Sequence, residues 1–200
     1  NNSKAKTEWF SDELPGKMRG VTYPLHFIDF ETSRMAIPYH KGMNPYEQIA
    51  FQWSCHTVKA PGAPPDHEEW INVDRKFPNF EFARSLRKQI GDKGTVLTWA
   101  HHESSVLSDI ALQMKKYRKD DGALADWLAD TVDEDSGRIL DLNKVTLKGY
   151  FHPDMRGKTS LKAVLPAVWN SDPALHELPW LTKYVQYDAA GGKVLDPYKT

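Results

Sequence analysis

Cysteine is nearly absent from this sequence, because Cys55 is the only one among 200 residues. A single cysteine excludes an intrachain disulfide framework and a cysteine-rich zinc site, and it fits a reducing compartment. Long apolar runs are absent too, since no stretch approaches the roughly 18 apolar residues that cross a bilayer. The first residues are polar and contain no apolar signal core. We therefore expect a cytoplasmic protein that does not enter a membrane.

An excess of charge of either sign is also missing, because 26 lysines and arginines face 27 aspartates and glutamates. Nucleic-acid binding therefore has to be argued from local features and not from a global positive field. The length and a hydrophobic content of 40% suffice for one well-buried core. We expect an N-terminal extension over residues 1–20 and one domain over residues 21–200. Residue 1 is Asn, not Met, so we expect either a trimmed chain or a domain cut from a longer protein.

Strand patterns are present in five places. A short aromatic and branched run and two further segments predict three strands that form a meander. An almost continuous apolar run predicts a buried parallel strand, and another short strand comes later in the chain. In chain order these segments are residues 23–30, 49–58, 68–73, 95–100 and 138–142.

Helical spacing is found between and after these strands. A first helix begins at Asn79, which can cap it, and ends at Gly94. A second follows residue 100, with apolar residues at helical spacing and lysines at its C-terminal end. Others are expected over residues 160–169, ending near Pro166, and from Thr182 onward, while the acidic residues 120–137 form a surface excursion or a short helix. Strands followed by alternating strands and helices predict an α/β fold with a mixed sheet.

Two carboxylates, Asp29 and Glu31, are two residues apart at the end of the first predicted strand. Their side chains therefore leave the same face of the sheet. Held that close, they repel each other unless a cation lies between them, and a hard divalent ion such as Mg²⁺ or Mn²⁺ accepts oxygen ligands of this kind. A solvated strand end is the alternative interpretation, because Asp-x-Glu is a common sequence.

Three short motifs resemble those of the DEDD exonuclease superfamily. The run FIDFET, residues 27–32, is similar to its first motif. Tyr184 and Asp188 match the tyrosine form of its third motif, in which the two residues are one helical turn apart. Glu103, in WAHHESSVL, occupies the place of the second motif, where the superfamily usually has Asp preceded by Asn. Asp109 is the alternative second acid.

A longer pattern, over residues 23–188, resembles a bacterial domain that is grouped with these exonucleases. Domains of that kind often follow a RecB-like or CRISPR-associated nuclease domain, so the resemblance implies such a domain as a partner within the longer protein. It also implies the architecture. We expect an α/β, RNase H-like mixed five-stranded sheet flanked by helices.

The resemblance implies a 3′-to-5′ exonuclease that hydrolyses single-stranded DNA or RNA with two Mg²⁺ or Mn²⁺ ions. Asp29, Glu31, Glu103 and Asp188 are then the metal ligands. All four are catalytic together with Tyr184, which orients the attacking water. The choice between DNA and RNA depends on contacts to the 2′-hydroxyl that no motif here records.

Further residues are candidates for substrate contacts. His102 lines the expected cleft, and Lys158 and Lys162 flank the start of a helix, where backbone amides and cations hold phosphate. Solvent exposure and an ordinary basic helix cap are the alternatives. Zinc binding by the adjacent His101 and His102 would lack the usual spacing of zinc ligands. Asp141 is interpreted as a strand-end residue that bonds a neighbouring turn.

Two other functions stay open at this point. The unusual second motif favours a catalytically weak domain that binds nucleic acid or a partner subunit for a larger nuclease. An RNase H-like endonuclease or transposase core would share the fold and the metals, but it would not explain the spacing from Tyr184 to Asp188. Fold alone does not decide between these functions, because one scaffold hosts several chemistries.

Overall fold

A computed structural model describes residues 7–117, 119–191 and 194–197 of the chain. The chain divides into two compact units. One is continuous, Val21–Leu142, and the other joins Asn1–Gly20 to Asn143–Thr200. The single domain expected over residues 21–200 stays a prediction.

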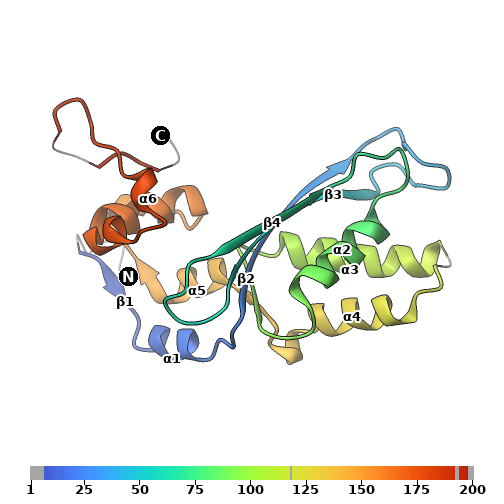
Figure 1. Ribbon diagram of the computed structural model, residues 1–200, viewed down its shortest axis with the longest axis horizontal. Coiled ribbons are helices and arrows are strands. Elements are labelled where there is room, and N and C mark those ends of the chain that lie inside the picture. The colour runs from blue at the N-terminus through green and yellow to red at the C-terminus, as the bar shows by residue number, and fades with distance from the viewer. Residues whose placement is uncertain (1–6, 118, 192–193, 198–200) are drawn as a thin grey trace. The chain divides into compact units, whose positions relative to one another are not determined.

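The unit Val21–Leu142 is built on a five-stranded sheet (Figure 1). β2, β3 and β4 form an antiparallel meander, whereas β5 pairs parallel to β2 and β6 pairs parallel to β5. This mixed sheet confirms the expected α/β fold class and is consistent with an RNase H-like arrangement. Its spatial order is β4-β3-β2-β5-β6, and its strands are β2 (Leu25–Arg34), β3 (Gln48–Val58), β4 (Asp66–Ile71), β5 (Thr95–Thr98) and β6 (Ile139–Asp141).

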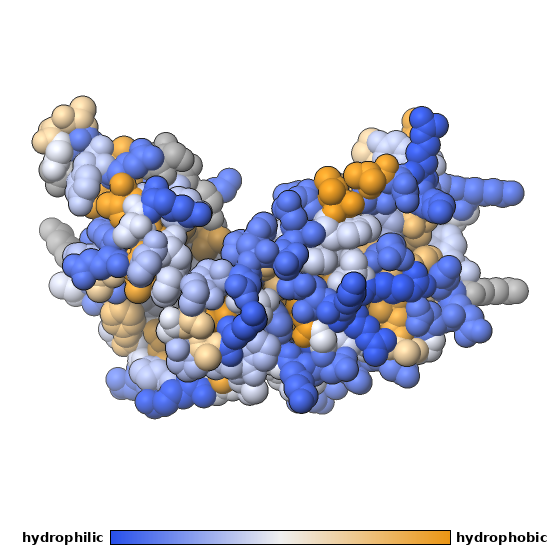
Figure 2. All heavy atoms as spheres, viewed as in Figure 1, coloured by the Kyte–Doolittle hydropathy of each residue, from blue (hydrophilic) through white to orange (hydrophobic). Residues whose placement is uncertain are grey.

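Two helices, α2 (Asn79–Ile90) and α3 (His102–Lys116), pack on one face of this sheet (Figure 1). Phe30 of β2 points into the core between them and meets Phe82 of α2 edge to face, with ring centroids 4.8 Å apart. The edge-to-face geometry adds to the burial of two large apolar rings. Over this unit, the side that Figure 2 shows is mostly hydrophilic, with a hydrophobic patch near its upper edge.

A third helix, α4 (Gly122–Val132), packs against both α2 and α3. Of the two structures expected for residues 120–137, the helix is therefore correct and the surface excursion is wrong. Leu124, Trp127 and Leu128 fall at helical spacing and are buried in the core cluster. Asp121 caps this helix, because its side chain accepts a hydrogen bond from the Leu124 amide at 3.2 Å.

The first predicted helix begins at Asn79, but this residue does not cap it. Asn79 is fully buried, and its side chain accepts from the Ala50 amide at 2.9 Å and donates to the Gln48 carbonyl at 2.9 Å. The helix also ends earlier than expected, at Ile90, with Gly91 at φ +57° after it. Gly94 serves another purpose, since a Cβ there would lie 2.1 Å from the Pro24 carbonyl oxygen.

Strand β2 is longer than predicted and continues to Arg34. Asp29 and Glu31 consequently lie inside the strand and not at its end. The pairing of β2 with β3 shifts register between Glu31 and Thr32, as at a β-bulge. Bulges of this kind re-aim side chains and are frequent next to functional sites.

The other unit contains a two-stranded sheet of β1 (Trp9–Phe10) and β7 (Tyr150–Phe151). Its helices are α1 (Leu14–Arg19), α5 (Leu142–Gly149), which begins at the unit boundary, and α6 (Leu161–Ser171), with the 3₁₀ turns η3 (Pro153–Met155), η4 (Pro173–Glu177) and η5 (Thr182–Tyr184). No helix in the described part of either unit is long and apolar enough to span a membrane.

Two expectations for the C-terminal region are wrong. Helix α6 continues through Pro166 to Ser171, although Pro166 cannot donate a backbone hydrogen bond. The helix expected from Thr182 onward is only the single turn η5, and the described residues after it, through Gly191 and over 194–197, form no helix. Tyr187 pairs with Val194 in an isolated bridge instead, and Gly191 has φ +71°.

Candidate functional site

The outer face of β2 carries the first two predicted ligands. Asp29 and Glu31 are exposed, whereas Ile28 and Phe30 alternate with them and are buried in the core. Asp29 pairs with Ser54 of β3 in the sheet register. The two carboxylates therefore share one face of the sheet, because side chains alternate along a strand.

Glu103 lies in the first turn of α3 and is only 5% exposed. Its Oε2 atom is buried and has no hydrogen-bond partner among the described residues. Burial raises the pKa of Glu103 to about 7; a hydrogen bond from its own backbone amide opposes the rise, and the charges of Asp29 and Asp141 add to it. Carboxylates from β2, α3 and β6 therefore act on one another electrostatically.

The turn between β5 and α3 determines where Glu103 lies. Ala100 adopts φ +77°, a conformation that L-residues with a side chain seldom take. Two hydrogen bonds of 3.0 Å hold it there: its amide donates to Asp141 Oδ1, and its carbonyl accepts from Thr98 Oγ1. The interpretation of Asp141 as a strand-end residue that bonds a neighbouring turn is confirmed.

The strain at Ala100 leads to a stability prediction. We expect Ala100→Gly to stabilise the protein by about 1 kcal/mol, because glycine adopts positive φ without a steric cost. Urea unfolding followed by circular dichroism measures the change. Ala111→Gly is the matched control within α3, where glycine is expected to destabilise by about 1 kcal/mol. Equal effects of the two substitutions would contradict the assignment of strain to Ala100.

His102 is the first residue of α3 and is exposed. Its Nε2 atom lies 3.5 Å from Thr32 Oγ1, at the long limit for a hydrogen bond. Thr32 follows the register shift of β2, so this contact brings the start of α3 next to the end of the carboxylate-bearing strand. The lining of a cleft by His102 and its contact with substrate both stay predictions.

The acidic side chains do not close into a cage. Within residues 7–117, 119–191 and 194–197, no group of three or more histidine, cysteine, aspartate or glutamate side chains is arranged to hold a metal ion. Asp29, Glu103 and Asp141 are nevertheless close enough for the charges of Asp29 and Asp141 to raise the pKa of Glu103. The structure thus brings Asp29 and Glu103, the acids predicted for the first and second motifs, into one electrostatic group with Asp141.

Tyr184 and Asp188 belong to the other unit. Tyr184 ends the turn η5 and is exposed, and Asp188 follows Tyr187 of the isolated bridge. The prediction that they lie one helical turn apart on one face is wrong, because the backbone from Val185 to Asp188 is not helical. Their proposed catalytic roles rest on the sequence motif alone.

Lys158 and Lys162 are both exposed in the same unit as Tyr184. Lys158 follows Gly157, which has φ +75°, and its amide donates to the Met155 carbonyl at 2.9 Å. Lys162 lies in the first turn of α6, whose N-cap residue, Ser160, makes no side-chain capping bond. A basic loop before a helix is therefore present as predicted, and phosphate binding by it stays a prediction.

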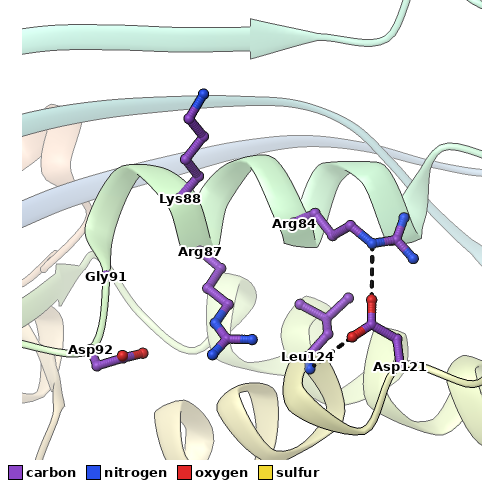
Figure 3. Close-up of a pocket in the computed structure, with 7 residues that line it drawn as sticks. All are labelled: Arg84, Arg87, Lys88, Gly91, Asp92, Asp121 and Leu124. Atoms are coloured by element: carbon purple, nitrogen blue, oxygen red, sulfur yellow. Dashed lines mark hydrogen bonds and ion pairs between the residues drawn. The ribbon is translucent and has the colours of Figure 1, made fainter.

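A pocket of about 330 Å³ lies between α2 and the start of α4 (Figure 3). Arg84 points to Asp121, and its Nε donates to Asp121 Oδ2 at 3.0 Å. Arg87 points toward α4 and donates to the Ala123 carbonyl at 2.7 Å, whereas Lys88 points away from α4. Both guanidinium groups already donate hydrogen bonds to the start of α4 and link the two helices. The pocket is therefore a weak candidate for an anion site.

A second pocket, of about 340 Å³, borders the end of β2 and helix α3. Sequence reasoning missed two of its residues, Tyr46 and Gln48. The Asn-Pro pair directly before Tyr46 predicts a turn. The neighbouring residues do not indicate that the ring of Tyr46 lines a pocket. Gln48 begins β3 and is buried. Glutamine is a polar residue that is mostly exposed, so the sequence gives no sign of this burial.

The fold and these carboxylates define a class: an α/β protein with an RNase H-like sheet whose second strand and third helix share a coupled acidic group. Residues 26–160, more than half of the chain, match the model of the family described as "Domain of unknown function (DUF2779)". The chain belongs to this family. No curated protein and no solved structure matches it. The matched range contains Asp29, Glu31 and Glu103 and ends before Tyr184 and Asp188.

Proposed function

We propose that the chain is a metal-dependent nuclease that hydrolyses single-stranded DNA or RNA from the 3′ end. Glu103 carries the proposal, because its buried carboxylate oxygen has no partner among the described side chains and because burial, with the charges of Asp29 and Asp141, raises its pKa. Folding alone disfavours a buried unpaired charge, and acids perturbed in this way gather at functional sites. The resemblance to DEDD exonucleases supplies the type of reaction.

A divalent cation would relieve two features of the acidic group, although no described set of three acidic side chains is arranged to hold one. The Oε2 atom of Glu103 needs a partner, and a cation near Glu103 and Asp29 would relieve the repulsion between the two carboxylates. Carboxylate oxygens are the ligands that Mg²⁺ and Mn²⁺ prefer. Two such ions, when bound, lower the pKa of a water molecule and stabilise the leaving 3′ oxygen.

The protein's own contribution is to hold these ligands in place. Asp29 and Glu31 extend from a central strand, and Glu103 extends from the start of α3, where the helix dipole favours an anionic phosphate. His102 donates a hydrogen bond to the same phosphate. The remaining roles stay predictions of the resemblance: metal ligation by Asp188, orientation of water by Tyr184, and backbone contacts by Lys158 and Lys162.

The proposal includes a cellular setting. Cytoplasm is the compartment that fits, because Cys55 is a buried free thiol and a reducing environment keeps thiols in that form. The partner implied by the resemblance is a RecB-like or CRISPR-associated nuclease domain in the same longer protein.

A second function, nucleic-acid binding without efficient cleavage, is favoured by one observation. Glu103 occupies the place where the exonuclease superfamily usually has Asp, and this departure from the second motif is the support for it. A domain of this kind would hold a strand for a larger nuclease. Activity measurements separate the two functions, because both predict binding and only one predicts metal-dependent product.

The nuclease proposal is tested with single-stranded DNA and RNA labelled at the 3′ or 5′ end, incubated with Mn²⁺, Mg²⁺ or EDTA. We expect metal-dependent loss of label from the 3′ end. Asp29→Ala and Glu103→Ala are each expected to reduce the rate at least about 100-fold, which corresponds to several kcal/mol of lost metal-assisted stabilisation. Asp188→Ala tests the third-motif ligand in the same assay.

Glu69→Ala is the matched control for this assay. Glu69 is an exposed carboxylate of β4 that pairs with Ser54, which in turn pairs with Asp29 across the sheet. Its removal is expected to leave the rate unchanged. Intact substrates at every metal concentration, with strand binding retained, would reject the nuclease and establish the binding function.

A further inference from the structure

The pocket at the end of β2 has no place in the chemistry proposed so far. It is open, with a volume of about 340 Å³, near the lower end of the range of about 300–1,000 Å³ for small-molecule sites. All of its lining residues belong to the unit Val21–Leu142, and they include Arg34, Tyr46, Glu47, Gln48, Asp109 and Lys116.

Gln48, in the wall of this pocket, carries an unsatisfied hydrogen-bond donor. The residue is 4% exposed, and its Nε2 atom has no acceptor among the residues that the structure describes. Arg34 Nε donates to Gln48 Oε1, and this contact fixes which end of the amide is the nitrogen. A buried donor without an acceptor is costly, so a ligand atom that accepts a hydrogen bond is the missing partner.

The charged groups around the pocket are already paired. Arg34 donates to Asp109 Oδ2 at 3.0 Å, and Lys116 Nζ lies 2.6 Å from Glu47 Oε2. Glu47 also accepts from the hydroxyl of Tyr117 at 2.9 Å. Two cations and two carboxylates give a lining without net charge, which suits an uncharged polar ligand better than a free phosphate.

Tyr46 supplies an aromatic surface at the pocket. It has φ +60°, and its amide donates to the Met35 carbonyl at 2.8 Å, which holds the turn in that conformation. The side chain is 65% exposed. A strained backbone that presents a large ring to solvent is typical of functional positions. An exposed tyrosine next to a hydrogen-bond donor suits a planar heterocycle. Such a ligand stacks on the ring of Tyr46 and accepts a hydrogen bond from Gln48.

The pocket and the carboxylates are built on the same two elements. Arg34 comes three residues after Glu31 on β2, and Asp109 comes six residues after Glu103 on α3. Six residues of helix extend about 9 Å. A stacked strand rises about 3.4 Å per nucleotide, so the pocket lies two to three nucleotides from the acidic group.

We propose that this pocket binds one nucleobase of the single strand, stacked on Tyr46 and accepting a hydrogen bond from Gln48. The base belongs to a nucleotide two or three positions from the scissile phosphate. This inference rests on the proposed nuclease function for the nature of the strand, but the pocket needs neither metal nor cleavage to bind.

The test measures binding in EDTA, so that no strand is cleaved. Single-stranded DNA and RNA ten-mers labelled at the 5′ end carry one abasic nucleotide at each position in turn, and fluorescence anisotropy gives the affinity. We expect wild type to bind about 5- to 150-fold more weakly when one particular position near the 3′ end is abasic, the effect of losing one base–aromatic stack. Tyr46→Ala should lose the same affinity for the intact strand and become insensitive to that position.

Two further substitutions make the result specific. Tyr46→Trp keeps a stacking surface and should retain both the affinity and the position dependence. Tyr39→Ala is the matched control, because Tyr39 is an equally exposed tyrosine, at 66%, that does not line the pocket. Gln48→Met, which removes the amide donor, should weaken binding at the same position while circular dichroism confirms folding.

Two outcomes would overturn the proposal that this pocket, here called the base pocket, binds a nucleobase. One is an affinity that is the same for every abasic position, and the other is an equal effect of Tyr46→Ala and Tyr39→Ala. If one abasic position near the 3′ end weakens binding as expected, while wild type and Asp29→Ala are equally inactive with Mn²⁺, the proposed base-binding pocket stands and the nuclease proposal fails. If cleavage depends on Asp29 and the affinity is the same for every abasic position, the nuclease stands and the base pocket fails.

Discussion

Glu103→Gln is expected to make the protein more stable than wild type by about 3 kcal/mol at pH 8, and by very little below pH 4.5. The pKa of Glu103 is raised from 4.5 to about 7, chiefly by burial. A raised carboxyl pKa contributes stability that is fully present below the unfolded value and is lost as pH rises through the folded value. Glutamine has nearly the same shape and cannot ionise, so the variant escapes that loss.

The measurement is the free energy of unfolding in urea from pH 4.5 to pH 8.5, for wild type and variant. The difference between them should grow through pH 5 to 7 and then level off. Glu68→Gln is the control for the same substitution at an exposed glutamate of β4, and its effect on stability should stay within about 0.5 kcal/mol. A constant difference for Glu103→Gln would mean that Glu103 ionises normally and would remove the main support for the site.

Binding of a divalent metal provides a second test of Glu103. At pH 8, Mg²⁺ or Mn²⁺ should raise the melting temperature of wild type, because a ligand that binds only the folded state stabilises it. Glu103→Gln should respond less, since it lacks one carboxylate ligand. An equal response of the two proteins would place the metal elsewhere.

Asn79→Ala is expected to lower the free energy of unfolding by about 3–5 kcal/mol, the range for breaking a buried hydrogen-bond network. The Asn79 side chain accepts from the Ala50 amide at 2.9 Å and donates to the Gln48 carbonyl at 2.9 Å and to Gln113 Oε1 at 2.5 Å. Alanine would leave the Ala50 amide and Gln113 Oε1 without these partners in the core. The loss is large because water cannot replace the missing bonds there.

Equilibrium unfolding in urea measures this loss. Asn72→Ala is the matched control, because the Asn72 side chain donates to the Asp74 carbonyl in an exposed turn, and a change within about 0.5 kcal/mol is expected. If Asn79 acted as a helix cap, its replacement would cost only about 1 kcal/mol. A loss of that size would contradict the network.

Gln48 lies at the junction between this network and the base pocket. Its carbonyl accepts from Asn79 and, at 2.9 Å, from Gln113 Nε2, while its side chain forms part of the pocket wall. The core therefore holds the backbone of a residue whose side-chain Nε2 has no acceptor among the described residues. Rigid support of this kind keeps a binding group oriented before its ligand arrives.

Local periodicity was enough to predict the strands of the sheet, but not their spatial order. The alternation in residues 49–58 and the apolar run that begins at Thr95 gave strands that the structure contains, and the two-residue spacing placed Asp29 and Glu31 on one face. These features depend on neighbours in the chain, because side-chain direction in a strand follows from backbone geometry alone. The helix of α3 was predictable for the same reason.

Predictions from residue spacing were wrong where distant parts of the chain determine a residue's contacts or its backbone conformation. Asn79 precedes an apolar run and has the identity of a cap, yet its partners come from Ala50 and Gln113. Tyr184 and Asp188 have the spacing of a helical turn, yet the chain there forms a 3₁₀ turn and an isolated bridge. A motif states which residues are present but not which backbone conformation the surrounding chain permits.

The sequence by itself determined the α/β class, the three-strand meander and the placement of the two carboxylates of β2 on one face, because hydrophobic periodicity and strand geometry are local properties. Only the tertiary structure decided that Glu103 is buried, that Asp29 and Asp141 raise its pKa, and that Gln48 keeps a donor without an acceptor among the described residues. Burial and charge coupling arise when segments distant in sequence pack together, so no local pattern contains them.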